Sequence, residues 1–158
     1  MTKRLGIFGG SFDPIHIGHL LIASDICEHL CLDAVHFVLA PRPPHKQQLM
    51  AADTHRIAML RMAIESDDRF VLDLREFDRT GPSFTVQTLE SFVSEDPNAT
   101  LFFIMGEDSL AEFPTWYQPE RILQLAHLAV ACRPGTDVDL ASIERKLPAA
   151  TGRIDMVE

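Results

Sequence analysis

Two glycines and two histidines near the N-terminus have the spacing of a phosphate-binding loop. Gly9 and Gly10 follow a short apolar segment, and the missing side chains would let backbone N–H groups approach an anion. His16 and His19 are three residues apart, so on a first helical turn they share a face and can reach one triphosphate. Gly18 keeps that face open. A tight turn with surface histidines would explain either feature alone, but the joint pattern favours phosphate chemistry.

The segments around this loop alternate between strand-like and helix-like patterns. Short apolar runs are typical of buried parallel strands, and apolar residues one turn apart indicate helices. The alternation predicts an α/β fold, a doubly wound, Rossmann-like parallel sheet that binds ligands at the carboxyl ends of its strands. We expect strands at 3–8 (ending at the glycine pair), 34–40, 70–74, 101–105, 127–132 and 153–157, and helices from about 18, from 53, after 83, at 119–125 and at 139–146.

Several polar residues near the expected helix starts are candidate caps. Asp53 or Thr54 could cap the second helix, Ser83 the third, and Asp108 a helix that begins near position 109. Asp13 cannot usefully contact phosphate, so we expect it to hold the backbone or a histidine within its own loop.

Composition limits the class of protein. A chain of 158 residues with 46% hydrophobic and 23% charged residues fits one globular domain. Its sequence has no apolar run long enough for a membrane helix and no pattern of a signal peptide, so we expect a cytoplasmic location. The net charge of −9 argues against general nucleic-acid binding but allows a small phosphorylated substrate. Cys27 and Cys31 lie in an apolar helical pattern, so we expect buried thiols and no metal site built by the protein.

The segment from Gly9 to His19, Gly-Gly-Ser-Phe-Asp-Pro-Ile-His-Ile-Gly-His, resembles the signature of the His-x-Gly-His nucleotidyltransferase superfamily. Segments 41–46, 55–60, 79–89, 103–108 and 133–135, together with Trp116, resemble one branch, the bacterial nicotinate mononucleotide adenylyltransferases, along essentially the whole chain. The resemblance implies transfer of AMP from ATP to nicotinate mononucleotide, giving deamido-NAD and pyrophosphate in NAD biosynthesis. An acceptor phosphate is already ionised at neutral pH, so the site must supply alignment and charge stabilisation and needs no strong base.

The resemblance also implies roles for individual residues. We expect the partners to be ATP and nicotinate mononucleotide, with Mg2+ bound to the ATP. We expect neither nucleic acid nor a membrane to bind. A homo-oligomer is a possible assembly. The expected catalytic residues are His16, His19 and Lys46; the ATP-binding residues are Gly9, Gly10, Ser11, Phe12, Gly18, Gly106 and Asp108; and the acceptor-binding residues are Thr85, Trp116, Tyr117 and Arg133.

The chain departs from the family pattern at its end. Family members continue into an Ile-Ser-Ser-Thr-x-Ile-Arg-like element that contacts the ATP phosphates, whereas this sequence stops at Glu158. We therefore expect residues 1–158 to form a single nucleotidyltransferase domain truncated at its C-terminal end, which binds ATP poorly and turns over slowly compared with an extended version. A naturally short, weak enzyme is another interpretation.

Two other functions remain open from the sequence. One is an adenylyltransferase for another small phosphate acceptor, of the pantetheine-phosphate type, because such enzymes share the first loop. Trp116 and residues 81–85 favour the pyridine nucleotide over that acceptor. The other is a nucleotide-binding protein without catalysis. The preference between nicotinate and nicotinamide depends on backbone geometry around Trp116 and Tyr117, which the sequence leaves open.

Overall fold

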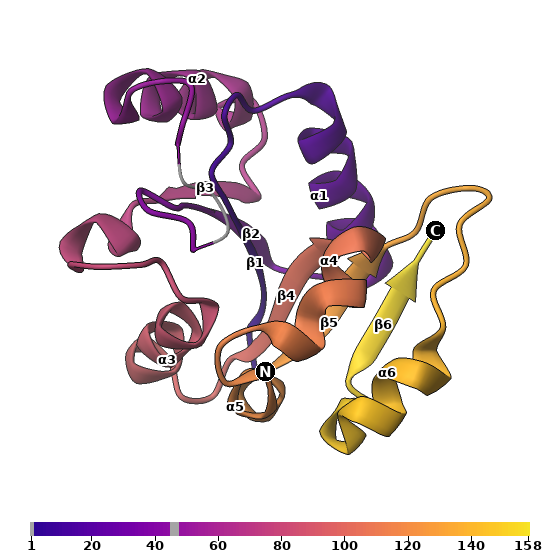
Figure 1. The fold of residues 1–158 in the computed structure, drawn as a ribbon. Coiled ribbons are helices and arrows are strands. Elements are labelled where there is room, and N and C mark those ends of the chain that lie inside the picture. The colour runs from indigo at the N-terminus through magenta and orange to yellow at the C-terminus, as the bar shows by residue number, and fades with distance from the viewer. Residues whose placement is uncertain (1, 45–47) are drawn as a thin grey trace.

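A computed structural model describes residues 2–44 and 48–158, which form a six-stranded parallel sheet covered by helices on both faces (Figure 1). The strand order is β3-β2-β1-β4-β5-β6, and every neighbouring pair is parallel. The doubly wound α/β prediction is therefore confirmed. The strands are β1 Arg4–Gly10, β2 Ala34–Leu39, β3 Phe70–Asp73, β4 Thr100–Gly106, β5 Ala126–Ala131 and β6 Ile154–Val157.

Helices connect consecutive strands and divide between the two faces. Helices α1 and α2 contribute to one apolar cluster, and α3, α4, α5 and α6 contribute to the other. The helices are α1 Ile17–His29, α2 Asp53–Ile64, α3 Thr85–Glu95, α4 Glu107–Glu112, α5 Pro119–Leu125 and α6 Leu140–Lys146, with short 3-10 turns η1 Arg75–Asp78, η2 Phe113–Thr115 and η3 Pro148–Ala150.

Strand β4 explains why the central strands read as unbroken apolar runs. All residues from 101 to 105 are buried, but successive side chains point to opposite faces. Leu101, Phe103 and Met105 join the cluster beneath α3 to α6, while Phe102 and Ile104 join the cluster beneath α1 and α2. A strand buried on both faces cannot alternate with polar residues, so only its length and its ends reveal it.

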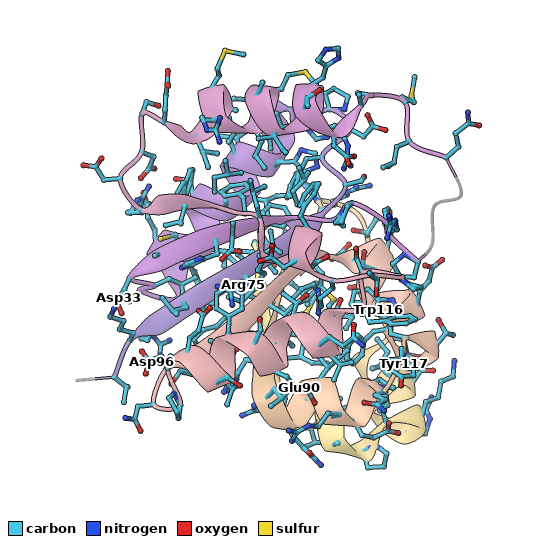
Figure 2. The ribbon with its side chains drawn as sticks, turned by 90° about the vertical axis from the view of Figure 1, so that its left-hand side faces the viewer. Asp33, Arg75, Glu90, Asp96, Trp116 and Tyr117 are labelled. Carbon is cyan, nitrogen blue, oxygen red and sulfur yellow. The ribbon has the colours of Figure 1, made fainter. Side chains whose placement is uncertain are left out.

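The topology places a crevice at one edge of the sheet. From β1 the chain winds outward through β2 to β3, and from β4 it winds the other way through β5 to β6. The loops after β1 and β4 therefore diverge, which leaves room for a ligand at the carboxyl ends of these two strands. Figure 2 shows Trp116 and Tyr117 at the opposite end of the molecule from Asp33 and Asp96, which precede β2 and β4.

The expected elements are all present, but several ends differ. Strand β1 continues through Gly9 and Gly10, which pair with Val38 and Leu39, so the strand includes the glycine pair and ends after it. The helix ends at 125 and 146 and the start at Pro119 agree with expectation.

The expected side-chain caps at three helix starts are wrong. Ala52 and Phe84 occupy the N-cap positions of α2 and α3 without a side-chain hydrogen bond, and Gly106 does so for α4. Asp108 lies inside the first turn of α4, and Ser83 instead accepts a hydrogen bond from the backbone of Arg42. A cap depends on backbone angles at one residue, which composition alone does not determine.

The cysteine prediction is only partly right. Cys27 is buried, as expected, but Cys31 is exposed in the turn after α1, at a positive φ of 52°. No group of three metal-ligating side chains is found among residues 2–44 and 48–158, and no helix in that part of the chain is long and apolar enough to cross a membrane.

Candidate functional site

A cavity of about 740 Å³ opens at the carboxyl ends of β1 and β4, the point where the winding direction changes. Backbone at Gly9, Gly10 and Gly106 forms part of its wall. Most of the other lining residues are apolar or aromatic. The lining residues are Ile7, Phe8, Gly9, Gly10, Ala40, Pro43, Pro44, Glu76, Ser83, Phe84, Thr85, Thr88, Phe103, Ile104, Met105, Gly106, Ser109, Thr115, Trp116, Tyr117, Gln118 and Ile122.

The two histidines form a reciprocal cap at the start of α1. His16 occupies the N-cap position, and its Nδ1 accepts a hydrogen bond from the Gly18 backbone at 3.1 Å. His19 Nδ1 accepts from the His16 backbone N–H, also at 3.1 Å, and the two rings stack with centroids 3.8 Å apart. The prediction that both rings share a face is confirmed. A side chain at Gly18 would collide with the His16 ring, since an added Cβ would lie 2.9 Å from it.

These contacts fix which nitrogen of each ring carries the proton. A nitrogen that accepts a hydrogen bond from an N–H cannot hold a proton itself, so each neutral ring carries its hydrogen on Nε2. His19 packs against Phe12 and Phe8, and burial together with the neighbouring His16 lowers the pKa of His19 to about 4. At neutral pH His19 is therefore uncharged, and it can stabilise an anion by donating a hydrogen bond from Nε2.

Long-range contacts hold the loop that carries these histidines. Arg56 of α2 is fully buried, and its Nη1 donates to the carbonyls of Ser11 at 2.8 Å and Ala40 at 3.0 Å, while its Nη2 pairs with Asp53. One guanidinium thus joins the ends of β1 and β2 to α2. Asp53, one of two candidate caps from the sequence, therefore pairs with Arg56 and does not cap α2.

Asp13 also fixes the loop through backbone contacts. Its carboxylate accepts hydrogen bonds from the backbone N–H groups of Met50 at 2.6 Å and Ala51 at 3.0 Å. Asp13 therefore holds backbone, as expected, but the backbone belongs to the segment before α2 and not to its own loop.

Aromatic rings form the opposite wall of the cavity. Trp116 is partly buried and packs edge-on against Phe103, with ring centroids 5.9 Å apart, and against Phe113. Tyr117 is half exposed and lies over Phe84, with ring centroids 4.6 Å apart. Trp116 therefore both packs in the fold and lines the cavity.

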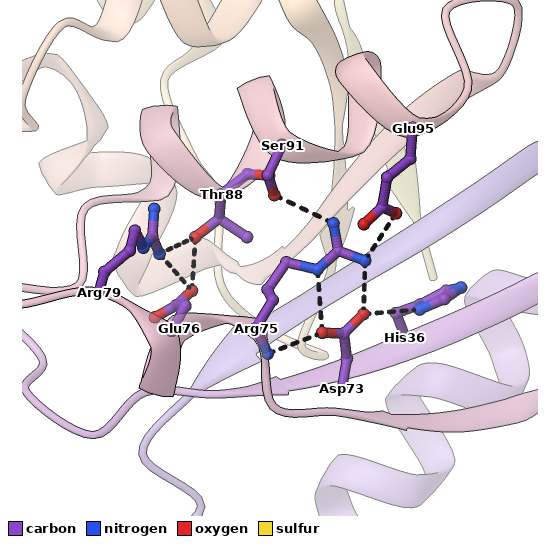
Figure 3. A network of polar contacts seen from close by, with 8 residues as sticks. All are labelled: His36, Asp73, Arg75, Glu76, Arg79, Thr88, Ser91 and Glu95. Atoms are coloured by element: carbon purple, nitrogen blue, oxygen red, sulfur yellow. Dashed lines mark hydrogen bonds and ion pairs between the residues drawn. The ribbon is translucent and has the colours of Figure 1, made fainter.

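A polar network joins the segment after β3 to α3 (Figure 3). Glu76 is buried and lines the cavity; its Oε2 accepts from Thr88 Oγ1 at 2.6 Å and lies 3.6 Å from Arg79 Nη2. Burial raises the pKa of Glu76, although Thr88, Arg79 and Ser83 partly oppose that shift. Its other oxygen, Oε1, has no hydrogen-bond partner among the described residues.

The other half of the network consists of charged side chains that pair with one another within the fold. Asp73 accepts from Arg75 and from His36, and these hydrogen bonds hold the pKa of Asp73 well below its usual range despite the opposing effect of burial. Arg75 also lies over the Phe92 ring at 3.4 Å and bonds Glu95, so it ties β3 to α3.

Not all of the expected site residues meet at the cavity. Gly9, Gly10, Gly106, Thr85, Trp116 and Tyr117 line it, whereas Ser11, Phe12, Gly18, His16, His19, Asp108 and Arg133 are outside its lining. The Phe12 side chain is buried in the core. Lys46 lies outside the described residues.

Asp108 and Arg133 meet each other on the rim between β4 and β5. Arg133 Nη1 lies 3.6 Å from Asp108 Oδ2, and their side chains are 72% and 89% exposed. Next to them, Thr136 donates a hydrogen bond to the buried Glu107 carboxylate, which links the loop after β5 to α4.

Sequence reasoning missed the roles of Arg56, Glu76 and Glu107. Each is a charged residue buried in the fold, and a single sequence offers little to separate such a residue from a solvated one. The signal for Arg56 was its place one residue before Ile57, on the helix face that also carries the inward Leu60.

Comparisons with known proteins give a consistent result. The family model described as Cytidylyltransferase-like matches residues 7–154. A protein named probable nicotinate-nucleotide adenylyltransferase from Thermomicrobium roseum is 46% identical over 98% of this chain and 73% of its own length. The nicotinate-nucleotide adenylyltransferase of Bacillus subtilis is 42% identical over 87% of this chain and 73% of its own length.

A solved structure shares the fold at much lower identity. The nicotinic acid mononucleotide adenylyltransferase of Plasmodium falciparum, complexed with NaAD, superposes with a TM-score of 0.77 at 22% identity. The match covers 98% of this chain and 74% of that one. It supports the doubly wound architecture.

Proposed function

The chain belongs to the Cytidylyltransferase-like family and, within it, to the nicotinate-nucleotide adenylyltransferases, and from this premise we propose that it transfers AMP from ATP to nicotinate mononucleotide. An oxygen of the acceptor phosphate attacks the α-phosphorus of ATP. The bond from that phosphorus to the bridging oxygen breaks, and pyrophosphate leaves. The product is deamido-NAD.

The reciprocal histidine cap carries this proposal. Because His16 and His19 both accept through Nδ1, both can present an Nε2–H donor on the same side of the stacked rings. Negative charge grows on the phosphate oxygens during transfer, and donors that are already oriented stabilise it without reorganisation. We propose that these two rings hold the triphosphate, and that Lys46 adds a positive charge to it.

The cavity suits a pyridine mononucleotide as the acceptor. Helix α3 starts at Thr85 on the cavity wall, and no side chain caps it, so its first N–H groups favour a bound carboxylate. Trp116 offers an aromatic face for a flat ring. We propose that Thr85, Trp116 and Tyr117 bind the nicotinate portion and that Arg133 binds the acceptor phosphate.

The ATP side is proposed to lie along β1 and β4. Gly9, Gly10, Ser11, Phe12 and Gly18 would surround the phosphates through backbone groups, and Gly106 and Asp108 would contact the adenosine. Because the described residues contain no group of three metal-ligating side chains, Mg2+ would be held by ATP and water. Bound there, it would neutralise phosphate charge.

Pyrophosphate release across a panel of acceptors tests this function. With ATP present, we expect kcat/KM for nicotinate mononucleotide to exceed that for pantetheine phosphate by at least about tenfold, since the site's polar groups pair with only one of them. Higher activity on pantetheine phosphate would assign the chain to the other acceptor class. ATP binding without release on any acceptor would instead support a nucleotide-binding protein.

A further inference from the structure

Glu76 is the one residue with a charged side chain among the described residues that line the cavity. It is 6% exposed, in the 3-10 turn after β3, and lies in contact with Thr88 of α3. A buried carboxylate needs compensation for the water that it has lost. Most of the remaining lining is apolar or aromatic, so this charge is conspicuous at a substrate pocket.

The two oxygens of Glu76 are used differently. Oε2 accepts from Thr88 at 2.6 Å and lies beside Arg79 at 3.6 Å. Oε1 is buried and has no hydrogen-bond partner among the described residues; the nearby Ser83 hydroxyl, which lowers the pKa of Glu76, accepts from the Arg42 backbone N–H at 3.3 Å. Buried polar atoms are nearly always satisfied in a functioning protein. The free oxygen therefore indicates a partner that a ligand supplies.

The position of Glu76 along α3 suggests which part of a ligand it meets. Helix α3 presents its uncapped start at Thr85, and Glu76 contacts Thr88, which is about one turn or 5 Å further along the helix. An anionic group at the helix start would place the ring that carries it alongside the next turn. In nicotinate mononucleotide, that ring is an N-glycosylated pyridinium with a positive charge.

We propose that Glu76 is a specificity residue whose free carboxylate oxygen faces the cationic pyridinium ring and selects it over an uncharged ring. This inference rests on the proposed function, because it takes the acceptor to be a pyridine mononucleotide. The carboxylate supplies the negative charge, and the aromatic side chains nearby, Phe84 and Trp116, exclude water from the contact. Arg79 moderates the charge of Glu76 from the other oxygen.

The test compares two acceptors that differ in ring charge. Nicotinate mononucleotide has a cationic ring, and its 1,4-dihydro form has a neutral ring with the same carboxylate, ribose and phosphate. Binding is measured through the fluorescence of Trp116, the single tryptophan of the chain, and turnover is measured through kcat and KM. The ratio of affinities for the two acceptors in wild-type protein is the reference.

The variant Glu76→Gln keeps the shape and removes the charge. We expect the preference for the cationic acceptor to fall about tenfold, through Kd and KM, with the KM for ATP unchanged. Arg79→Met removes the opposing cation and is expected to increase the preference. Glu95→Gln, in the same network but outside the cavity lining, should leave it unchanged. Thermal unfolding verifies that each variant is folded.

A fall of threefold or more in the preference of folded Glu76→Gln supports the assignment, and a smaller change overturns it. Equal losses for both acceptors would also overturn it, because they would indicate a hydrogen bond to a shared group. If Glu76→Gln does not fold, Arg79→Met decides in the same way: an unchanged preference overturns the assignment. Failure of the proposed function is distinguishable, since wild-type protein would then bind neither pyridine mononucleotide.

Discussion

The loop after β1 and the loop after β5 differ in how they are held. The loop from Gly9 to His19 is fixed by the buried Arg56, by Asp13 and by the reciprocal cap at the start of α1. Residues 133–138 after β5 are almost entirely exposed; Arg133 makes a 3.6 Å contact with the exposed Asp108, and Thr136 donates to the buried Glu107. The first loop is therefore held by several contacts with distant segments, whereas the second is held mainly by the hydrogen bond from Thr136 to Glu107.

From this difference we expect the two loops to have different functional roles. A preorganised site pays little entropy when the transition state forms, so it can contribute to the rate of chemistry. An exposed side chain must be immobilised on binding, so it contributes mainly to affinity and selectivity. Variants in the first loop should therefore change kcat or folding, and variants in the second should change KM.

The largest effect is expected at the histidine pair. His16→Ala and His19→Ala should each lower kcat about 100- to 1000-fold, because each removes one oriented donor from the phosphates. Steady-state kinetics of pyrophosphate release measure this. His29→Ala, exposed at the other end of α1, is the matched control and should retain full activity. If His16→Ala and His19→Ala both kept the wild-type kcat, the first loop would not contribute to the rate of the reaction.

Next comes the anchor of the first loop. Arg56→Met leaves the carbonyls of Ser11 and Ala40 without their donor and should lower the free energy of unfolding by about 3 kcal/mol. Urea denaturation measures the loss. Arg61→Met on the exposed face of the same helix should change it by less than about 0.5 kcal/mol. If the two variants were equally stable, Arg56 would not anchor the loop.

A smaller effect follows from the pKa of His19. Because folding lowers this pKa to about 4, the neutral ring is favoured in the folded state, and its contribution to stability is complete above about pH 6.5. As the pH falls from 6.5 to 4, the unfolded chain binds a proton first and stability is lost. The partly exposed ring should account for about 1 kcal/mol.

Urea denaturation of wild type and His19→Gln at pH 7 and pH 4.5 isolates this contribution, since other titrating groups are common to both proteins. Wild type should lose more stability than the variant on acidification. Equal losses, or a greater loss in the variant, would contradict the assigned direction.

The smallest effect on stability is expected in the second loop. Arg133→Ala should change the free energy of unfolding by less than about 0.5 kcal/mol, because both members of its ion pair are exposed. The same change should raise the KM for nicotinate mononucleotide about tenfold, since it removes a cation from the acceptor phosphate. Arg145→Ala, exposed in α6, serves as the control. A stability loss with unchanged KM would reverse the roles of the two loops.

The sequence predicts the elements of this fold better than their ends. Apolar runs such as 101–105 and the proline at 119 indicate β4 and the start of α5 because burial and backbone geometry constrain them locally. The strand order and the hydrogen bond from Arg42 to Ser83 depend on contacts between distant segments. Those contacts are not encoded in any short window of residues.

The residues of the candidate site also differ in how well the sequence predicts them. His16 and His19 could be placed on one face because three-residue spacing on a helix determines it. The burial of Arg56 and Glu76 becomes visible only in the folded structure, where β2, β3 and α3 lie around them. From the sequence alone, a charged residue is expected at the surface. Local spacing thus predicts the histidine pair, and tertiary packing determines the environment of the buried charged residues.

The fate of the α-phosphate of ATP tests directly whether the histidine pair supports AMP transfer. Labelled at that phosphorus, ATP is incubated with nicotinate mononucleotide and either wild-type protein or the double variant His16→Ala/His19→Ala. We expect wild type to transfer the label into a dinucleotide and the double variant to do so at least about a thousandfold more slowly. Folded wild type that forms no labelled dinucleotide, or a folded double variant that forms it at the wild-type rate, would contradict it.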